Sequence, residues 1–238
     1  MVKFADDTYL IIPADKHHTA EAELKNVESW AEANNLRLNQ SKTVEIILYN
    51  PDKKKGRKDI PAARPGQVRA DTITALGVEL SNNFSMRKHV DSLLTSCNQT
   101  LFALWTLRAH GLSSDALHAI FMSVAIGKLR YAAPAWYGFT SAEDWERLEV
   151  FLRKSKCAGY CAPATPTFSS MCADADKTLF ATIRADSHHV LHKLLPPVAP
   201  RTYNLRPLAH NYVLPQRTSS LADKNFLTRM LYNGVAAC

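Results

Sequence analysis

Two adjacent carboxylates near the N-terminus, Asp6 and Asp7, are the residues of this chain best suited to chemistry. They stand between short apolar runs, where a strand hairpin usually carries an uncharged Asn-Gly or Asp-Gly turn. Two like charges about 4 Å apart repel by about 1 kcal/mol in water and by more near a protein interior, so a fold that keeps both ionised usually supplies a cation. Magnesium is the natural candidate because it prefers oxygen ligands. The alternative is a solvated acidic turn.

Further motifs follow this pair along the chain. The first reads Leu36-Arg37-Leu38-Asn39-Gln40-Ser41-Lys42-Thr43 and is followed by the apolar run Val44-Glu45-Ile46-Ile47-Leu48. Others are Leu76-Gly77-Val78, Phe84, His89, Tyr131-Ala132, Trp136 and the tail Asn225-Phe226-Leu227-Thr228-Arg229-Met230-Leu231-Tyr232. With Phe4-Ala5-Asp6-Asp7, and in this order, they resemble the reverse transcriptase of non-long-terminal-repeat (LINE-type) retrotransposons, especially Jockey-like members. The resemblance spans about residues 3–160 and the tail.

The resemblance implies an α+β fold, with part of a polymerase palm (a β-hairpin, a helix and strands) followed by a mostly α-helical thumb. It implies RNA-directed DNA synthesis, with an RNA template, a DNA primer and Mg²⁺ in the complete enzyme. Asp6 matches the principal metal ligand and Asp7 its auxiliary, so we expect both to be catalytic. Lys42 matches a family position near the leaving pyrophosphate, where a cation can donate a proton or offset charge; the alternative is a surface lysine.

The family's other indispensable acid lies on a strand before the Ala-Asp-Asp hairpin, as does its nucleotide-selecting helix. Because Met1 stands only three residues before the motif, we expect these parts, the fingers and any endonuclease domain to be absent from this polypeptide. We therefore expect a fragment that is inactive as an isolated chain. Two alternatives stay open, a non-catalytic nucleic-acid-binding module and a non-functional gene remnant.

The net charge of +7 is unevenly distributed along the 238 residues. Residues 1–50 are net acidic, whereas a basic run occupies the segment 51–70. Basic runs neutralise phosphates with little sequence preference, so we expect nucleic acid binding there, with a solvated loop as the alternative. The candidate nucleic-acid-binding residues are Lys53, Lys54, Lys55, Arg57 and Lys58 in this run and Arg87 and Lys88 beyond it.

Hydrophobic periodicity and breakers divide the chain into four segments. We interpret residues 1–50 as the end of the palm, 51–70 as a basic linker, 71–160 as the primer-contacting strand and thumb, and 161–238 as a loosely ordered C-terminal region. The expected elements are a hairpin over 1–12, strands over 44–49 and 72–80, and helices over 19–33, 85–110, 114–131, 141–159 and 179–195. The second strand of the hairpin is apolar on both faces, which predicts that other layers cover it.

Other candidate sites fail on spacing. His188 and His192 are four residues apart but lack a glutamate and a further ligand, and three of the five cysteines (Cys157, Cys161 and Cys172) lack a histidine partner. An odd number of cysteines without a compact framework predicts reduced thiols. With no apolar run of about 20 residues and no signal peptide, we expect no membrane partner and an intracellular protein of the nucleus and cytoplasm. Most of the aromatic residues Trp105, Tyr131, Trp136, Tyr137 and Trp145 fit the core of the thumb, with stacking on bases as the alternative.

Overall fold

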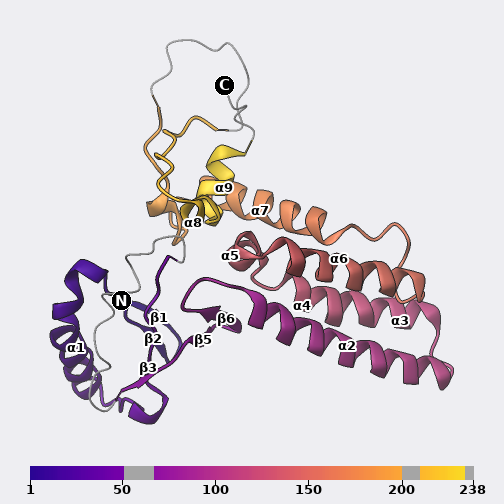
Figure 1. The fold of residues 1–238 in the computed structure, drawn as a ribbon, viewed down its shortest axis with the longest axis horizontal. Helices are drawn as coiled ribbons and strands as arrows, with labels where there is room; N and C mark the ends of the chain where they lie inside the picture. The colour runs from indigo at the N-terminus through magenta and orange to yellow at the C-terminus, as the bar shows by residue number, and fades with distance from the viewer. Residues whose placement is uncertain (51–66, 200–209, 234–238) are drawn as a thin grey trace. The chain divides into compact units, whose positions relative to one another are not determined.

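The computed structural model describes residues 1–50, 67–199 and 210–233, and it is of the predicted α+β class (Figure 1). The chain groups into two compact units, one of Met1–Glu45 with Ala62–Arg69 and one of Ile46–Pro61 with Ala70–Cys238. Within the described ranges, no helix has both the length and the apolar character needed to cross a bilayer. The four-segment division of the sequence stays a prediction.

The first unit contains short strands and one long helix. Its elements are β1 (Val2–Phe4), β2 (Asp7–Tyr9), η1 (Ala14–Thr19), α1 (Ala20–Ala33), η2 (Gln40–Lys42), β3 (Val44–Glu45) and β4 (Val68–Arg69). Strands β1 and β2 pair antiparallel, whereas β3 and β4 pair parallel. The predicted hairpin and helix are therefore confirmed, but the strand expected over 44–49 is only two residues long.

The first unit has almost no apolar core among its described residues. Its buried hydrophobic residues are Ala20 and Ala31. Larger apolar side chains are exposed instead, namely Met1, Val2, Phe4, Ile11, Trp30, Leu36, Leu38, Val44 and Val68. The prediction that both faces after the hairpin turn would be covered was wrong, because the chain leaves the strand at Tyr9 and Ile11 is 73% exposed.

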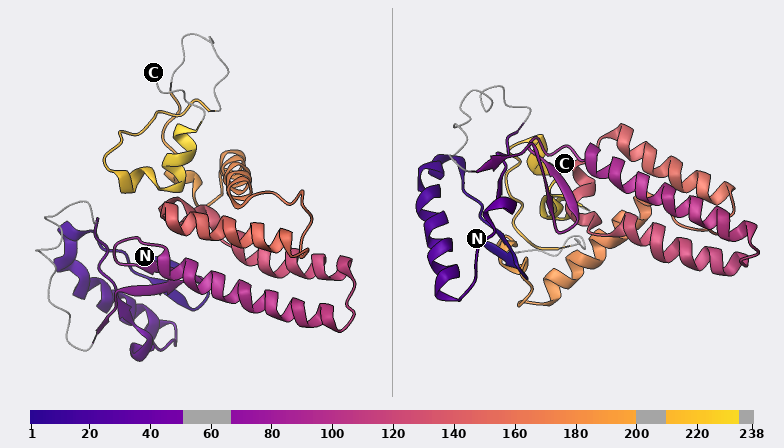
Figure 2. Two further views of the ribbon diagram at one scale, coloured as in Figure 1. Left: turned by 45° about the vertical axis from the view of Figure 1, so that its right-hand side comes forward. Right: turned by 90° about the horizontal axis from the view of Figure 1, so that it is seen from below.

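The second unit is a helical bundle that carries one β-hairpin. Its elements are β5 (Thr72–Ala75), β6 (Val78–Ser81), α2 (Arg87–Ala109), α3 (Ser114–Ile120), η4 (Phe121–Ile126), α4 (Gly127–Arg130), α5 (Ala133–Trp136), η5 (Tyr137–Phe139), α6 (Ala142–Cys157), α7 (Phe168–Ala185), η6 (His192–Leu194), α8 (Ser220–Asp223) and α9 (Phe226–Tyr232). The helices α2 and α6 run side by side (Figures 1 and 2), and α7 packs against α5 and α6. Segment η4 is π-helical and continues α3 without a break, so the helix predicted over 114–131 is confirmed with a π segment inside it.

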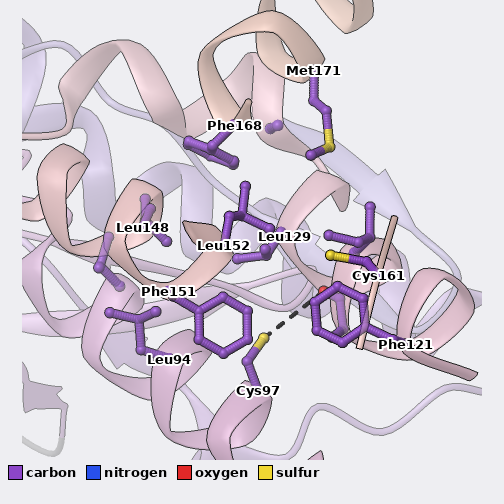
Figure 3. Packing of buried hydrophobic residues seen from close by; sticks show 14 of the residues in the cluster. Leu94, Cys97, Phe121, Leu129, Leu148, Phe151, Leu152, Cys161, Phe168 and Met171 are labelled. Carbon is purple, nitrogen blue, oxygen red and sulfur yellow. Dashed lines mark hydrogen bonds between the residues drawn. The ribbon is translucent and has the colours of Figure 1, made fainter. Parts of the chain in front are cut away.

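One continuous apolar core fills the bundle, and its central residues interlock across the helices (Figure 3). Trp136 is 1% exposed, stacks on Phe168 at 6.0 Å and donates from Nε1 to the Tyr131 carbonyl at 3.1 Å. Its ring also meets the buried His89 edge-on at 4.8 Å. The core thus connects α2, α5 and α7 through a single indole, whereas the sequence predicted only the first of these three helices at its observed place.

The segment predicted as a single strand over 72–80 is a hairpin. Leu76 and Gly77 both have positive φ, 48° and 79°, and form the two-residue turn between β5 and β6. The Tyr131 hydroxyl donates to the Leu76 carbonyl at 3.0 Å, and a Cβ on residue 77 would lie 3.3 Å from the Tyr131 ring. Glycine at 77 therefore serves both the turn and the close approach of Tyr131.

The C-terminal segment packs against α7 through an apolar cluster that includes Phe180 and Ile183, and through one arginine. The helix predicted over 179–195 is instead α7, Phe168–Ala185, and the described residues 210–233 form two short helices with Phe226, Met230 and Leu231 buried. Arg229 Nη2 donates to the Asp176 carboxylate at 3.1 Å, and its guanidinium lies 4.1 Å from the Tyr137 ring. A Cβ at position 138 would overlap Arg229 Nη1, so Gly138 admits this side chain.

His89 is a buried titratable group at the contact between the β5–β6 hairpin and α2. Its Nδ1 accepts from the Glu79 backbone N–H at 3.4 Å, and Trp136 covers the ring. Burial lowers the pKa of His89 below its ordinary value, and the Glu79 carboxylate opposes this change. The folded state therefore favours the neutral imidazole.

We predict that acid destabilises the bundle through His89. The folded-state pKa of His89 is lowered. The stability that the buried neutral imidazole contributes is therefore fully present above about pH 6.5, the ordinary pKa of histidine, and declines as the pH falls below that value. The melting temperature of wild-type protein should therefore fall more between pH 7 and pH 5 than that of His89→Gln. The control His188→Gln, at an exposed histidine, should behave as wild type. Equal pH dependence in all three proteins would contradict the assignment.

We also predict selective cysteine reactivity. Burial raises the pKa of Cys97 to about 11 and that of Cys172 to about 12, and raises the pKa of Cys161, whereas Cys157 is exposed. Since the thiolate is the reactive form, iodoacetamide at pH 8 should label Cys157 within minutes and leave Cys97 and Cys172 unmodified until the protein is unfolded. Peptide-resolved mass spectrometry measures each site. Rapid labelling of Cys97 in native protein would contradict the packing.

Candidate metal site and nucleic-acid-binding residues

The hairpin of β1 and β2 holds the two aspartates at its tip. Phe4 pairs with Asp7, so Ala5 and Asp6 are the two central residues of the turn. Ala5 has a φ of 50°, as the first central residue of both turn types favoured in hairpins does. Asp6 and Asp7 are both exposed. The predicted hairpin turn with paired carboxylates is therefore confirmed, and it presents both acids to solvent.

The strand register assigns side chains of the hairpin to two faces. Phe4 and Asp7 are opposite each other on one face, and Lys3 and Thr8 share the other. The Lys3 ammonium lies 2.7 Å from the centroid of the Trp30 ring, so the Lys3 face is the one that meets α1. Asp7 therefore stands on the face directed away from α1, beside the exposed ring of Phe4.

The carboxylates at this tip are of the chemical type that binds a hard cation, but they are too few to complete the coordination of the ion. Both aspartates offer carboxylate oxygens, the ligands that Mg²⁺ prefers, and Asp7 accepts only a long hydrogen bond of 3.4 Å from the Tyr9 hydroxyl. Across residues 1–50, 67–199 and 210–233, no group of three or more acidic, histidine or cysteine side chains is placed to hold a metal. The pair can hold a single ion weakly, with water as its remaining ligands.

Lys42 lies at the end of a compact turn organised by Asn39. The Asn39 carbonyl accepts from the Lys42 backbone N–H at 3.1 Å and from the Thr43 hydroxyl at 3.1 Å, and its side-chain oxygen accepts from Ser41 at 2.6 Å. This turn explains the spacing of the Asn-x-x-Lys-Thr motif. Lys42 is exposed and, in the described part of the chain, forms no ion pair with Asp6 or Asp7.

Two predicted nucleic-acid-binding residues lie in the first turn of α2. Arg87 is exposed and donates through both Nη atoms to the Glu143 carboxylate, at 3.0 and 3.2 Å. Lys88 is exposed and donates to the Thr72 hydroxyl at 2.9 Å. The other predicted residues, Lys53, Lys54, Lys55, Arg57 and Lys58, lie outside the described residues.

Sequence reasoning missed the acidic partners on α6. Arg147 bridges Asp91 of α2 at 2.5 Å and the buried Asp144 at 2.8 Å, one helical turn beyond the Arg87–Glu143 pair. Both interhelical pairs join residues 56 positions apart, a regularity that a search for opposite charges at constant separation would find. These pairs align α2 with α6.

Several other predictions are corrected or refined here. Trp136 is core and Tyr137 and Trp145 pack against it, so most of the five aromatic residues are core as predicted, whereas Trp105 and Tyr131 are each 56% exposed. His188 and His192 do not share a helix, because α7 ends at Ala185 and η6 begins at His192.

Comparisons of the chain with protein-family models, with curated proteins and with solved structures each found no match.

We predict that Glu143 restrains Arg87. Glu143→Gln removes the carboxylate that occupies the guanidinium fork and makes Arg87 available to phosphate, so binding of an RNA–DNA duplex at low salt should tighten about two- to threefold. Fluorescence anisotropy with a labelled duplex measures the change. Glu28→Gln, at an exposed acid of α1, alters the net charge equally without freeing an arginine. If both variants gain the same affinity, the pair has no specific effect.

Proposed function

We propose that this chain carries the metal-binding hairpin and thumb of an RNA-directed DNA polymerase of the LINE type. The observation that carries the proposal is the pair Asp6 and Asp7, exposed together at the tip of a tight antiparallel hairpin. Carboxylates at such a tip are accessible to a cation and to the end of a nucleic acid strand, since the turn leaves the space before them open to solvent.

Three further features support the proposal. The motif containing Lys42 forms a turn that exposes a cation in the same unit as the aspartates. The β5–β6 hairpin directly precedes α2 and is fixed by Tyr131, as a strand that guides a primer must be. The helices α2, α6 and α7 form a rigid bundle with a continuous core, which suits a thumb that contacts a duplex through Arg87 and Lys88.

Asp6 would hold Mg²⁺ as its principal ligand and Asp7 as the auxiliary one. When bound, the ion would activate a primer hydroxyl or offset charge on the phosphates. The chain's own contribution is to keep two carboxylates adjacent and accessible, with Ala5 leaving room beside them. Phe4 adds an apolar surface opposite Asp7, which is suited to packing against a sugar or base.

The alternative is a nucleic-acid-binding module without catalysis. One observation favours it, since the described residues supply no third ligand beside the aspartates. A centre of two metal ions needs more carboxylates than this pair provides. Under this alternative, the bundle would bind a duplex while the hairpin would have no chemical role.

We predict that Asp6→Asn removes divalent-metal binding at the hairpin. Mn²⁺, a paramagnetic substitute for Mg²⁺, should broaden the backbone amide signals of Thr8 and Tyr9 at concentrations of about 1 mM, because two carboxylates make a weak site. Asp6→Asn should lose most of this broadening. The matched variant Asp15→Asn, at another exposed acid of the same unit, should retain it. Broadening that persists in Asp6→Asn would remove the metal argument.

Primer extension separates the two functions. With an RNA template, a DNA primer, deoxynucleotides and Mg²⁺, synthesis that Asp6→Asn abolishes supports the polymerase. Salt-sensitive duplex binding without synthesis, together with no Mn²⁺ effect at the hairpin, supports the binding module.

A further inference from the structure

Two large aromatic side chains are exposed side by side on α2. Phe102 is 68% exposed and Trp105 is 56% exposed, with their ring centroids 5.9 Å apart and their planes inclined by 30°. Isolated exposed apolar residues are common, but two adjacent rings that are each more than half exposed form a surface. Neither ring contributes to the core of the bundle.

The register between α2 and α6 identifies the neighbourhood of these rings. Arg87 pairs with Glu143 and Asp91 with Arg147, so the helices run parallel and residues 56 positions apart are opposite each other. Two helical turns beyond Asp91 and Arg147, the same faces carry Asn98 on α2 and Lys154 on α6. Phe102 and Trp105 continue the α2 side. Along these facing sides of α2 and α6, ion pairs come first, Lys154 follows opposite Asn98, and the two aromatic rings lie one and two helical turns further along α2.

Few acidic residues accompany these groups in the sequence. The segments 92–114 and 150–173 carry Arg108, Arg153, Lys154 and Lys156 and contain no aspartate or glutamate, although Asp115 follows directly and Arg153 is paired with Glu146 at 3.1 Å. Lys154 is exposed and has no carboxylate partner within the described ranges. Arg108 donates to the Ala158 carbonyl at 2.8 Å, which ties the end of α2 to the end of α6. Basic side chains therefore outnumber acidic ones at this end of the bundle, which suits a polyanion.

We infer that this distal surface, defined by Phe102, Trp105, Arg108 and Lys154, binds single-stranded nucleic acid. Bases would stack on the two rings while phosphates lie near the cations, the combination that single-strand binding requires. An unpaired strand is favoured over a duplex because only unstacked bases offer their faces to exposed rings. An acidic protein would satisfy the cations but would leave the stacking geometry unexplained.

The distal surface is separate from the duplex contacts proposed above. Arg87 and Trp105 are 18 positions apart on one helix, which is about 27 Å at 1.5 Å per residue. The inference does not depend on the metal hairpin. It requires only the bundle, whose core is continuous from α2 to α7.

The test measures binding of a labelled 20-nucleotide oligodeoxythymidylate and of oligouridylate of equal length. Trp105→Leu should weaken binding about tenfold, whereas Trp105→Phe, which keeps a stacking face, should lose less than about threefold. Lys154→Gln should weaken binding about threefold and reduce the slope of log affinity against log salt by about 0.7. Quenching of tryptophan fluorescence by the oligonucleotide should disappear in Trp105→Phe.

Matched controls make the outcome decisive. Trp30→Leu, which removes another exposed indole, should leave oligonucleotide binding unchanged, and circular dichroism verifies that each variant is folded. Unaltered affinity in both Trp105→Leu and Lys154→Gln would overturn the inference. So would a preference for duplex over single strands that persists in Trp105→Leu, or binding of an acidic peptide in place of the oligonucleotide. Asp6→Asn should not affect this binding, so failure of the metal proposal and failure of this one are distinguishable.

Discussion

The burial of Trp136 is the interaction on which the second unit depends. Its indole contacts His89 of α2 and Phe168 of α7, and its N–H fixes the Tyr131 carbonyl. Tyr131 in turn holds the turn of the β5–β6 hairpin through its hydroxyl. One buried ring therefore determines both how the helices meet and where the hairpin lies. An aromatic side chain with a satisfied polar atom is well suited to such a position, because it combines a large buried area with a directional bond.

Much of the fold could be predicted because the amphipathic helices follow a strict period. The helices that begin at Arg87, Ser114 and Ala142 lie within a few residues of their predicted ends. The helix of Phe168–Ala185 was displaced in the prediction because Pro163 and Pro166 just before it indicated irregular structure, although Thr167 caps its first turn. The turn at Leu76-Gly77 was missed because leucine is rare at positive φ, and only the contact with Tyr131 explains it.

The candidate site was predictable where it is local in sequence and unpredictable where it depends on tertiary contacts. Asp6 and Asp7 lie at a hairpin tip because alternating apolar residues flank a two-residue turn. The engagement of Arg87 by Glu143 joins residues far apart in the chain, so composition alone does not reveal it. Trp105 has the helical spacing of a core residue, yet it lies just beyond the buried stripe of α2. A difference of one position on a helix rotates a side chain by about 100°.

The close approach of Arg229 to Gly138 couples three residues that are far apart in the chain, namely Gly138, Asp176 and Arg229. A side chain at 138 would expel the guanidinium, and without it the buried carboxylate of Asp176 would lose its counter-charge. A mutation at any one of the three therefore lowers the benefit of keeping the other two. Over evolutionary time these residues should be replaced together or not at all, so their joint presence in related sequences would mark chains that retain a docked C-terminal helix.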